Sequence, residues 1–261
     1  MSRIDNKFVV EGPTLRALVP DLAQTFDILD IEKQRSFTYA TRYFDDDAKS
    51  AYFEHHQGVR KGFKVRVRRY VDAGLCFLEV KVKGQRGMTE KYRMPYDPET
   101  LDALTREATD FAQTTYSTQY EKPFDYALVP SLDVQYRRIT LVAREGGERM
   151  TIDTDLKFSA NGRNLETGSD LFIVETKSAN GRGVADVLLR SAKVRPAKRC
   201  SKYCVGMAAM GQVSRYNHFL PTMRQLGLAP SWQPLGLWSE TPSDLFAHLH
   251  GPSSISNSAA A

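Results

Sequence analysis

Two neighbouring segments of the chain alternate cationic and apolar residues. In the first, Lys64, Arg66 and Arg68 share one parity, with valines between them. In the second, Lys81 and Lys83 alternate with apolar residues in the same way. Alternation of period two predicts β-strands that each present one charged face. Because like charges on adjacent strands repel, a polyanion or oligophosphate that neutralises them would explain the pattern.

Charged faces recur on most of the other predicted strands, with lysine and arginine in excess over carboxylates. The faces contain Arg3, Asp5 and Lys7; Lys91 and Arg93; Tyr136, Arg138 and Thr140; Arg149, Thr151, Asp153, Asp155 and Lys157; and Glu175 and Lys177. For any single strand, the ordinary interpretation is a solvated face of an open sheet. An antiparallel sheet that closes into a barrel would instead turn these faces inward and form a basic tunnel.

The elements that must position these residues can be read from periodicity and turn signals. Strands are predicted at residues 3–10, 36–44, 62–70, 74–83, 87–95, 131–143, 148–158 and 171–178, and helices at 14–27, 98–112, 182–194 and 201–219. The "DAGL" and "EGGE" segments are typical of hairpin turns. We therefore expect an α+β fold, an eight-stranded antiparallel β-barrel tunnel with helices packed on its outside.

Composition sets broader limits. The chain has 261 residues, a net charge of +5 and a pI near 9.0, which favours anionic partners. Three cysteines argue against a disulfide framework and for a reducing compartment. Neither a signal-peptide core nor an apolar run of about 18 residues is present, so we expect a cytoplasmic protein without a transmembrane segment. We expect one domain over residues 1–220 and an extension over 221–261 whose end is disordered.

An ordered series of short motifs resembles the VTC domain, which belongs to the triphosphate tunnel metalloenzymes. The motifs are "RIDNKF" (3–8), "YFDD" (43–46), "FKVRVRRY" (63–70), "FLEVKVKG" (77–84), "YRR" (136–138), "RMTIDTDL" (149–156), "VETKS" (174–178) and "CSKYCVGM" (200–207). Phe8 stands where tyrosine is common, and Cys200 where an aromatic residue is common. The resemblance implies an eight-stranded antiparallel tunnel and metal-dependent chemistry on triphosphates. The eukaryotic members act as ATP-dependent polyphosphate polymerases.

The resemblance also implies roles for individual residues. Tunnel residues that hold phosphates would be Lys7, Arg66, Arg68, Lys81, Lys91, Arg138 and Arg149, of which Arg66, Arg68, Lys81, Arg138 and Arg149 are the expected catalytic residues. A closing phosphate-binding segment would contain Arg199, Ser201 and Lys202, and Glu175 would bind Mn²⁺ or Mg²⁺. The shared strand faces add Lys64, Lys83, Arg93, Tyr136 and Lys177 as substrate-binding candidates. Glu79, Asp153 and Asp155 either bind metal or form salt bridges with the arginines.

The function expected is transfer of the γ-phosphate of ATP, or of another nucleoside triphosphate, onto inorganic polyphosphate. The alternatives are hydrolysis of tripolyphosphate or nucleoside triphosphates, and a non-catalytic polyphosphate-binding module. Specific nucleic-acid binding is not expected, because few aromatic residues are placed for base stacking. His55 and His56 lack metal-site spacing and are expected in a helix or turn near the tunnel mouth. We also expect that loss of Arg66 or Arg68 relieves repulsion and stabilises the empty protein.

Overall fold

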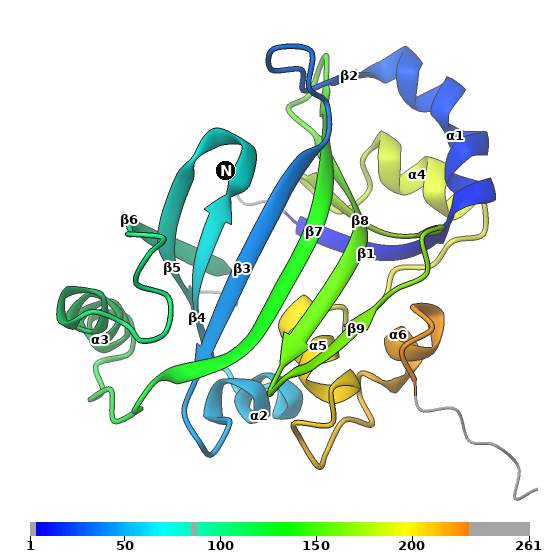
Figure 1. Ribbon diagram of the computed structural model, residues 1–261. Coiled ribbons are helices and arrows are strands. Elements are labelled where there is room, and N and C mark those ends of the chain that lie inside the picture. The colour runs from blue at the N-terminus through cyan, green and yellow to red at the C-terminus, as the bar shows by residue number, and fades with distance from the viewer. Residues whose placement is uncertain (1–3, 85–87, 230–261) are drawn as a thin grey trace, which may run out of the picture. The chain divides into compact units, whose positions relative to one another are not determined.

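The computed structural model describes residues 4–84 and 88–229, which lie in one compact unit, Met1–Ala229 (Figure 1). This unit extends beyond the expected boundary at residue 220. The short helix α6 (Leu220–Gln225) belongs to it, because Met223 packs into its core. The rest of the expected extension, with its low-complexity end, lies outside the described residues. No helix in the described ranges has the length and apolarity needed to cross a bilayer.

One antiparallel sheet organises the chain, with the spatial order β1-β10-β8-β7-β3-β4-β5-β6. Its strands are β1 (Ile4–Glu11), β3 (Phe37–Asp45), β4 (Phe63–Tyr70), β5 (Leu75–Lys83), β6 (Thr89–Pro95), β7 (Val129–Ala143), β8 (Arg149–Ala160) and β10 (Leu171–Ser178). Two short strands that the sequence did not predict, β2 (Phe26–Ile28) and β9 (Arg163–Glu166), pair with β7 and β8. The α+β class and the eight main antiparallel strands are confirmed.

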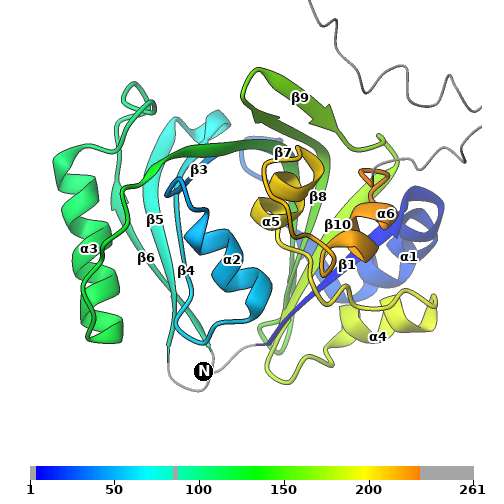
Figure 2. The ribbon, with the colours of Figure 1, turned by 90° about the horizontal axis from the view of Figure 1, so that it is seen from below.

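The sheet curves strongly but is not closed into a barrel. The end strands β1 and β6 do not pair with each other within the described residues, so the expected barrel is corrected to an open, curved sheet (Figure 2). A different segment occupies the free edge of β1. The backbone N–H of Ala197 donates to the carbonyl of Lys7 at 2.7 Å, which satisfies an edge acceptor that β6 would otherwise have to reach. We call the concave side of this sheet the lumen.

Helices cover the convex side of the sheet and one end of it. Helix α3 (Arg106–Tyr120) packs on β4, β5 and β6 through a cluster that contains Val65, Val80 and Tyr116. Helices α1 (Gly12–Thr25) and α4 (Val184–Ser191) cover the face of β1, β10 and β8. Helices α2 (Ser50–Gln57) and α5 (Lys202–Ala209) lie across one end of the sheet in both ribbon views (Figures 1 and 2). Where α1, α3 and α4 cover the sheet, the strands are therefore apolar outward and carry their charged residues toward the lumen.

Helix α3 begins eight residues later than the sequence predicted. Pro98 and Glu99 lie in a turn, and the helix starts after Thr105, whose side chain accepts a hydrogen bond from the N–H of Ala108. This cap satisfies one of the unpaired amides of the first turn. The apolar residues that face the sheet recur at helical spacing only from Ala108 onward, which explains the shift.

The alternation of β8 breaks at Asp155. This residue adopts a positive φ of 54°, and the pairing of β7 with β8 shifts register between Gln135 and Arg137. The bulge places two residues of β8 on the same side and reverses the parity that follows. Leu156 and Phe158 therefore join the core under α5, whereas Lys157, which the sequence placed on the charged inner face, lies exposed.

Candidate functional site

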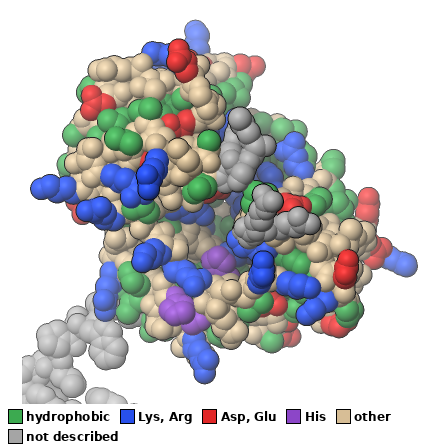
Figure 3. Space-filling view, turned by 180° about the vertical axis from the view of Figure 1, so that it is seen from behind, with side chains coloured by type: hydrophobic (Ala, Val, Ile, Leu, Met, Phe, Trp, Pro, Cys, Tyr) green, Lys and Arg blue, Asp and Glu red, His purple; other side chains and the backbone are tan. Residues whose placement is uncertain are grey.

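The registers of the strand pairs bring the predicted cations onto one face of the sheet. Lys64 pairs with Lys81 and Lys81 with Lys91, while Arg66 lies opposite Glu79. On the other half of the sheet, the residues that share this face are Lys7, Arg138, Arg149, Thr151, Asp153, Glu175 and Lys177. Lysine and arginine side chains gather around a hollow in the view from behind, with histidines beside it (Figure 3). The lumen is therefore lined by basic residues from both halves of the sheet.

Glu79 is the centre of one charge cluster in the lumen. Its carboxylate is fully buried and accepts from Arg66 at 2.5 Å and from Lys91 at 3.1 Å, with Arg68 at 3.9 Å. Burial alone would raise the pKa of Glu79, but the nearby guanidinium groups outweigh it and hold the pKa well below its usual range. Glu79 is thus a permanently charged partner of the arginines.

Asp153 is the centre of a second cluster. It binds Arg138 through two hydrogen bonds, at 2.6 and 2.8 Å, and it also contacts the ammonium of Lys202 from α5. Both cations lie over the ring of Tyr136, with the Nζ of Lys202 4.7 Å from the ring centroid. Tyr136 is buried, and its hydroxyl has no hydrogen-bond partner among the described residues. Asp153 therefore fixes two predicted phosphate ligands in place.

Glu175 forms the third cluster. Lys177 lies 2.9 Å from one carboxylate oxygen and Lys7 lies 3.7 Å from the other, and Lys177 also contacts Asp5 at 3.3 Å. Burial opposes ionisation, but Lys7 and Lys177 outweigh it and hold the pKa of Glu175 well below its usual range. The group is therefore an ionised carboxylate that still has partial access to solvent.

A row of lysines on β4, β5 and β6 contrasts with these paired groups. Lys64, Lys81 and Lys91 are adjacent in register, but within the described part of the chain only Lys91 reaches a carboxylate. Lys64 donates to the hydroxyl of Ser201 at 3.1 Å. The charge of Arg66, together with burial, lowers the pKa of Lys81 well below 10.5, and burial chiefly lowers that of Lys64. These lysines repel one another when no anion is present.

The remaining predicted residues lie nearer the rims of the lumen. Arg93 is exposed and stacks on Phe77 at 4.7 Å, and Arg149 is exposed next to Lys177 in register. Lys83 contacts the hydroxyl of Thr89. Arg199 donates to the carbonyl of His55 on α2. None of these cations pairs with a carboxylate within the described ranges, so they remain available to an anion that enters.

His55 was not predicted as a site residue, although it was expected near the tunnel mouth. It is partly buried on α2 beside the lumen cations. Burial, reinforced by Lys64 and Arg199, lowers the pKa of His55 to about 2. The imidazole is therefore neutral at physiological pH. The residues around His55 in the sequence do not have the spacing of a metal site. Its place beside Lys64 and Arg199 is therefore evident only from the fold.

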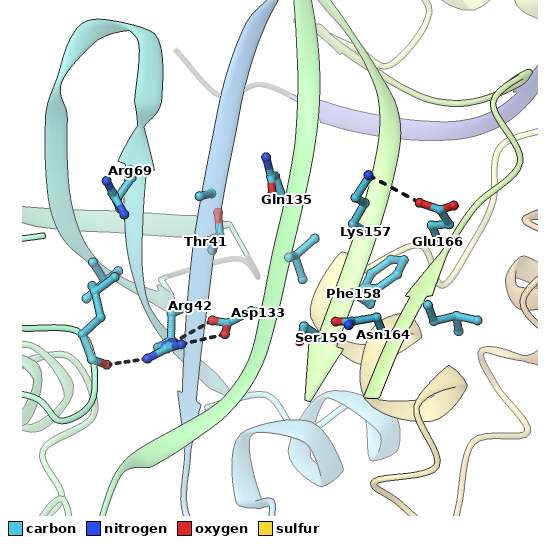
Figure 4. A pocket seen from close by; sticks show the side chains of 15 residues that line it. Thr41, Arg42, Arg69, Asp133, Gln135, Lys157, Phe158, Ser159, Asn164 and Glu166 are labelled. Atoms are coloured by element: carbon cyan, nitrogen blue, oxygen red, sulfur yellow. Dashed lines mark hydrogen bonds and ion pairs between the residues drawn. The ribbon is translucent and has the colours of Figure 1, made fainter. Parts of the chain in front are cut away.

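The convex face shows how charged residues outside the lumen are arranged. Arg42 binds Asp133 through two hydrogen bonds of 2.7 Å, and Lys157 lies 3.5 Å from Glu166, around a groove of about 810 Å³ (Figure 4). Arg69 also lines this groove, on the opposite parity from Arg66 and Arg68. Alternation along β4 therefore separates the lumen arginines from an outer one.

The lumen offers few oxygen donors for a divalent metal ion. No group of three or more His, Cys, Asp or Glu side chains in the described residues is arranged to hold a metal ion. Glu175 remains as one ionised carboxylate, with the hydroxyl of Thr151 opposite it in register. Hard divalent cations favour oxygen ligands and often bind through one or two carboxylates plus substrate phosphates. The residues fit a metal that arrives with its phosphates, and they do not form a cage of their own.

Comparisons with known proteins complete the description. Among solved structures, the chain is similar to a putative adenylate cyclase from Bacillus halodurans (TM-score 0.47, 13% identity, 75% of this chain and 94% of that one). It is also similar to a putative adenylyl cyclase from Hippeastrum that has a dominant triphosphatase activity (TM-score 0.47, 16% identity, 83% and 100%). No curated protein sequence matches the chain. A family model described as the VTC domain matches residues 2–211. The chain therefore belongs to the VTC domain family.

Proposed function

We propose that the lumen binds the phosphates of a nucleoside triphosphate or of tripolyphosphate and transfers a phosphoryl group. The observation that carries this proposal is the excess of cations on one face of a single curved sheet. Arginine binds phosphate oxygens through a planar fork, and lysine adds compact charge. The row formed by Lys64, Lys81 and Lys91 would be neutralised by a bound phosphate chain.

The preferred acceptor in this proposal is a polyphosphate chain. ATP enters with its phosphates among the lumen cations, and the terminal oxygen of the chain attacks the γ-phosphorus. The bond to the β-phosphate breaks, ADP leaves, and the polyphosphate is longer by one phosphate. Arg66, Arg68, Lys81, Arg138 and Arg149 would orient the reacting groups and stabilise the charge that develops on the transferred phosphoryl group.

Glu175 is the proposed metal ligand. A bound Mn²⁺ or Mg²⁺ would offset charge on the phosphate oxygens of the reacting triphosphate. Glu175 is suited to this because its carboxylate stays ionised among cations and is still partly accessible. No side-chain nucleophile is required, since positioning and electrostatics supply most of the catalysis in phosphoryl transfer.

Hydrolysis is the second candidate, in which water replaces the phosphate acceptor. One structural observation favours it. Helices α2 and α5 lie across one end of the sheet, and an apolar cluster containing Leu132, Leu156 and Phe158 fills the concave side there. A growing polymer would have to leave through the other end, whereas orthophosphate and a shortened product could leave by the same route as the substrate.

Incubation of the protein with ATP and Mn²⁺, followed by electrophoresis of the products, distinguishes the candidates. Long phosphate chains support the polymerase, and orthophosphate without chains supports the hydrolase. Binding of tripolyphosphate without turnover indicates a non-catalytic binding module. If the protein neither turns over ATP nor binds tripolyphosphate, the proposed function is wrong.

A further inference from the structure

Thr151 is a buried lumen residue whose hydroxyl has no hydrogen-bond partner among the residues that the structure describes. It is on β8, and the residue is 5% exposed. Four buried side-chain oxygens in the described part of the chain lack a partner, and two of them, those of Thr151 and Tyr136, face the lumen. A buried hydroxyl without a partner is costly, and most such groups in proteins are satisfied. The cost is explained if the partner of Thr151 is a ligand.

The neighbours of Thr151 show what kind of ligand that would be. Thr151 lies between Thr140 and Glu175 in register, and Glu175 lies next to Lys7. Arg149 and Lys177 occupy the adjacent register positions on the same face. A hydroxyl can donate one hydrogen bond and rotate to suit its acceptor. An anionic oxygen held by these cations is the acceptor that the surroundings favour.

We propose that the hydroxyl of Thr151 donates a hydrogen bond to a phosphate oxygen of the bound triphosphate, beside Glu175. This proposal rests on the proposed phosphate-binding function of the lumen, and it adds a neutral donor to a site otherwise made of charges. A short hydroxyl on the wall of the sheet fixes the position of a phosphate more closely than flexible lysines do, because its reach is limited. Thr151 is thus a substrate-binding residue that charge patterning does not reveal.

Thr176 provides a matched comparison within the same sheet. It follows Glu175 on β10, is fully buried and points to the outer face. Its hydroxyl donates to the buried carboxylate of Asp186 at 2.9 Å. The two threonines therefore share residue type, burial and proximity to Glu175, but of the two only Thr176 finds a hydrogen-bond partner in the described ranges.

The test is calorimetric titration with tripolyphosphate in metal-free buffer, together with a thermal melt, for Thr151→Val, Thr151→Ser and Thr176→Val. Valine keeps the shape and removes the hydroxyl. Thr151→Val should weaken tripolyphosphate binding about 10- to 100-fold, as expected for a hydrogen bond to a charged group, without lowering the melting temperature. Thr151→Ser should retain most of the affinity. Thr176→Val should bind as the unchanged protein does but melt several degrees lower.

The outcomes separate this inference from the function on which it rests. If the unchanged protein does not bind tripolyphosphate, both fail. If it binds and Thr151→Val binds equally well, the lumen function stands and the role of Thr151 is wrong. A loss that appears only when Mn²⁺ is added would also overturn the proposal, because it would make Thr151 a metal ligand and not a phosphate donor.

Discussion

Arg66 and Glu79 face each other across β4 and β5 inside the lumen, with 2.5 Å between Nη2 and Oε2 and 2.8 Å between Nε and the same oxygen. Glu79 is fully buried and Arg66 is 7% exposed. A buried carboxylate that loses its partner is much less favourable than the intact pair. Arg66 therefore keeps Glu79 satisfied in the empty protein, in addition to its proposed role in binding phosphate.

Replacement of Arg66 by alanine should weaken phosphate binding and also destabilise the fold. Loss of a charge-assisted hydrogen bond predicts about a 10- to 100-fold weaker binding of tripolyphosphate. The free energy of unfolding should fall by about 1–3 kcal/mol, because Glu79 then keeps only Lys91 at 3.1 Å and the more distant Arg68 at 3.9 Å. The sequence alone suggested the opposite effect on stability, from relief of repulsion. Calorimetric titration and a thermal melt measure the two effects.

Arg69 and Glu79 supply the controls for this prediction. Arg69→Ala removes a cation from the convex face and should change neither affinity nor stability appreciably. Glu79→Gln added to Arg66→Ala should recover stability without recovering affinity, since it removes the unpaired charge. Equal losses of affinity in Arg66→Ala and Arg69→Ala would show that phosphate binds a diffuse basic surface, and the lumen would have to be abandoned as the site.

The strands and their charged faces could be predicted because alternation is a local property of the sequence. For example, Lys64, Arg66 and Arg68 share a face in the structure as their spacing indicated, and their partners Lys81 and Glu79 follow from the adjacent hairpin. The antiparallel pairing of β4 with β5, of β5 with β6 and of β7 with β8 also follows from the short connections between them. These parts of the site require no knowledge of distant contacts.

The parts that could not be predicted depend on contacts between distant segments. The bulge at Asp155 reverses the parity of Lys157. Aspartate tolerates a positive φ, but nothing in "IDTDLK" distinguishes Asp155 from Asp153 in this respect. The open edge of β1 depends on Ala197, which is remote in sequence from Lys7. The curvature of the sheet sets which carboxylates pair with which cations. From the sequence alone, Glu79 and Asp153 could therefore be assigned either to metal binding or to salt bridges with the arginines.

Asp153 restrains two cations, so its neutralisation should affect binding and stability in opposite directions. Asp153→Asn leaves Arg138 and Lys202 without their shared carboxylate, and the melting temperature should fall by several degrees. The lumen would at the same time gain positive charge, and tripolyphosphate should bind at least as tightly as before, provided that Arg138 keeps its position. Titration and melting of the same preparation provide both measurements.

The matched control is the bidentate pair of Arg42 and Asp133 on the convex face. Asp133→Asn breaks a pair of the same geometry, but that pair is more exposed and lies outside the lumen. It should leave tripolyphosphate affinity unchanged and reduce stability by less than about 1 kcal/mol. A marked loss of tripolyphosphate affinity in Asp153→Asn would contradict the proposed balance of charges.

Phosphate binding should be linked to proton uptake through Lys81. In the empty lumen, Arg66 and burial lower the pKa of Lys81 well below 10.5, and a bound phosphate chain would raise it again. Between these two pKa values, binding takes up protons and affinity falls as the pH rises. The same depressed pKa means that the unfolded chain binds more protons in this window, so the contribution of Lys81 to stability increases with pH. Titrations in buffers of different ionisation enthalpy measure the uptake.

Lys81→Met separates this effect from protonation of the ligand itself. The protonation of tripolyphosphate itself contributes equally in the experiments with the two proteins. The difference in proton uptake between the two proteins therefore comes from Lys81 and the groups coupled to it. The variant should take up fewer protons per ligand bound, and its affinity should depend less on pH. Identical proton uptake by the two proteins would mean that Lys81 is already charged in the empty lumen.

Glu175→Gln should abolish metal-dependent turnover while the fold remains intact. Glutamine keeps the shape of the side chain but removes the charge that a divalent cation requires from the protein. Lys7 and Lys177 lose their shared partner, although Lys177 keeps Asp5 at 3.3 Å, so the melting temperature should change little. Tripolyphosphate binding without metal should be retained or strengthened, because a negative charge leaves the lumen.

Glu166→Gln, which affects an exposed pair on the convex face, is the control. If Mn²⁺ still stimulates ATP turnover in Glu175→Gln, another oxygen ligand holds the metal, and Glu79 is the next residue to replace.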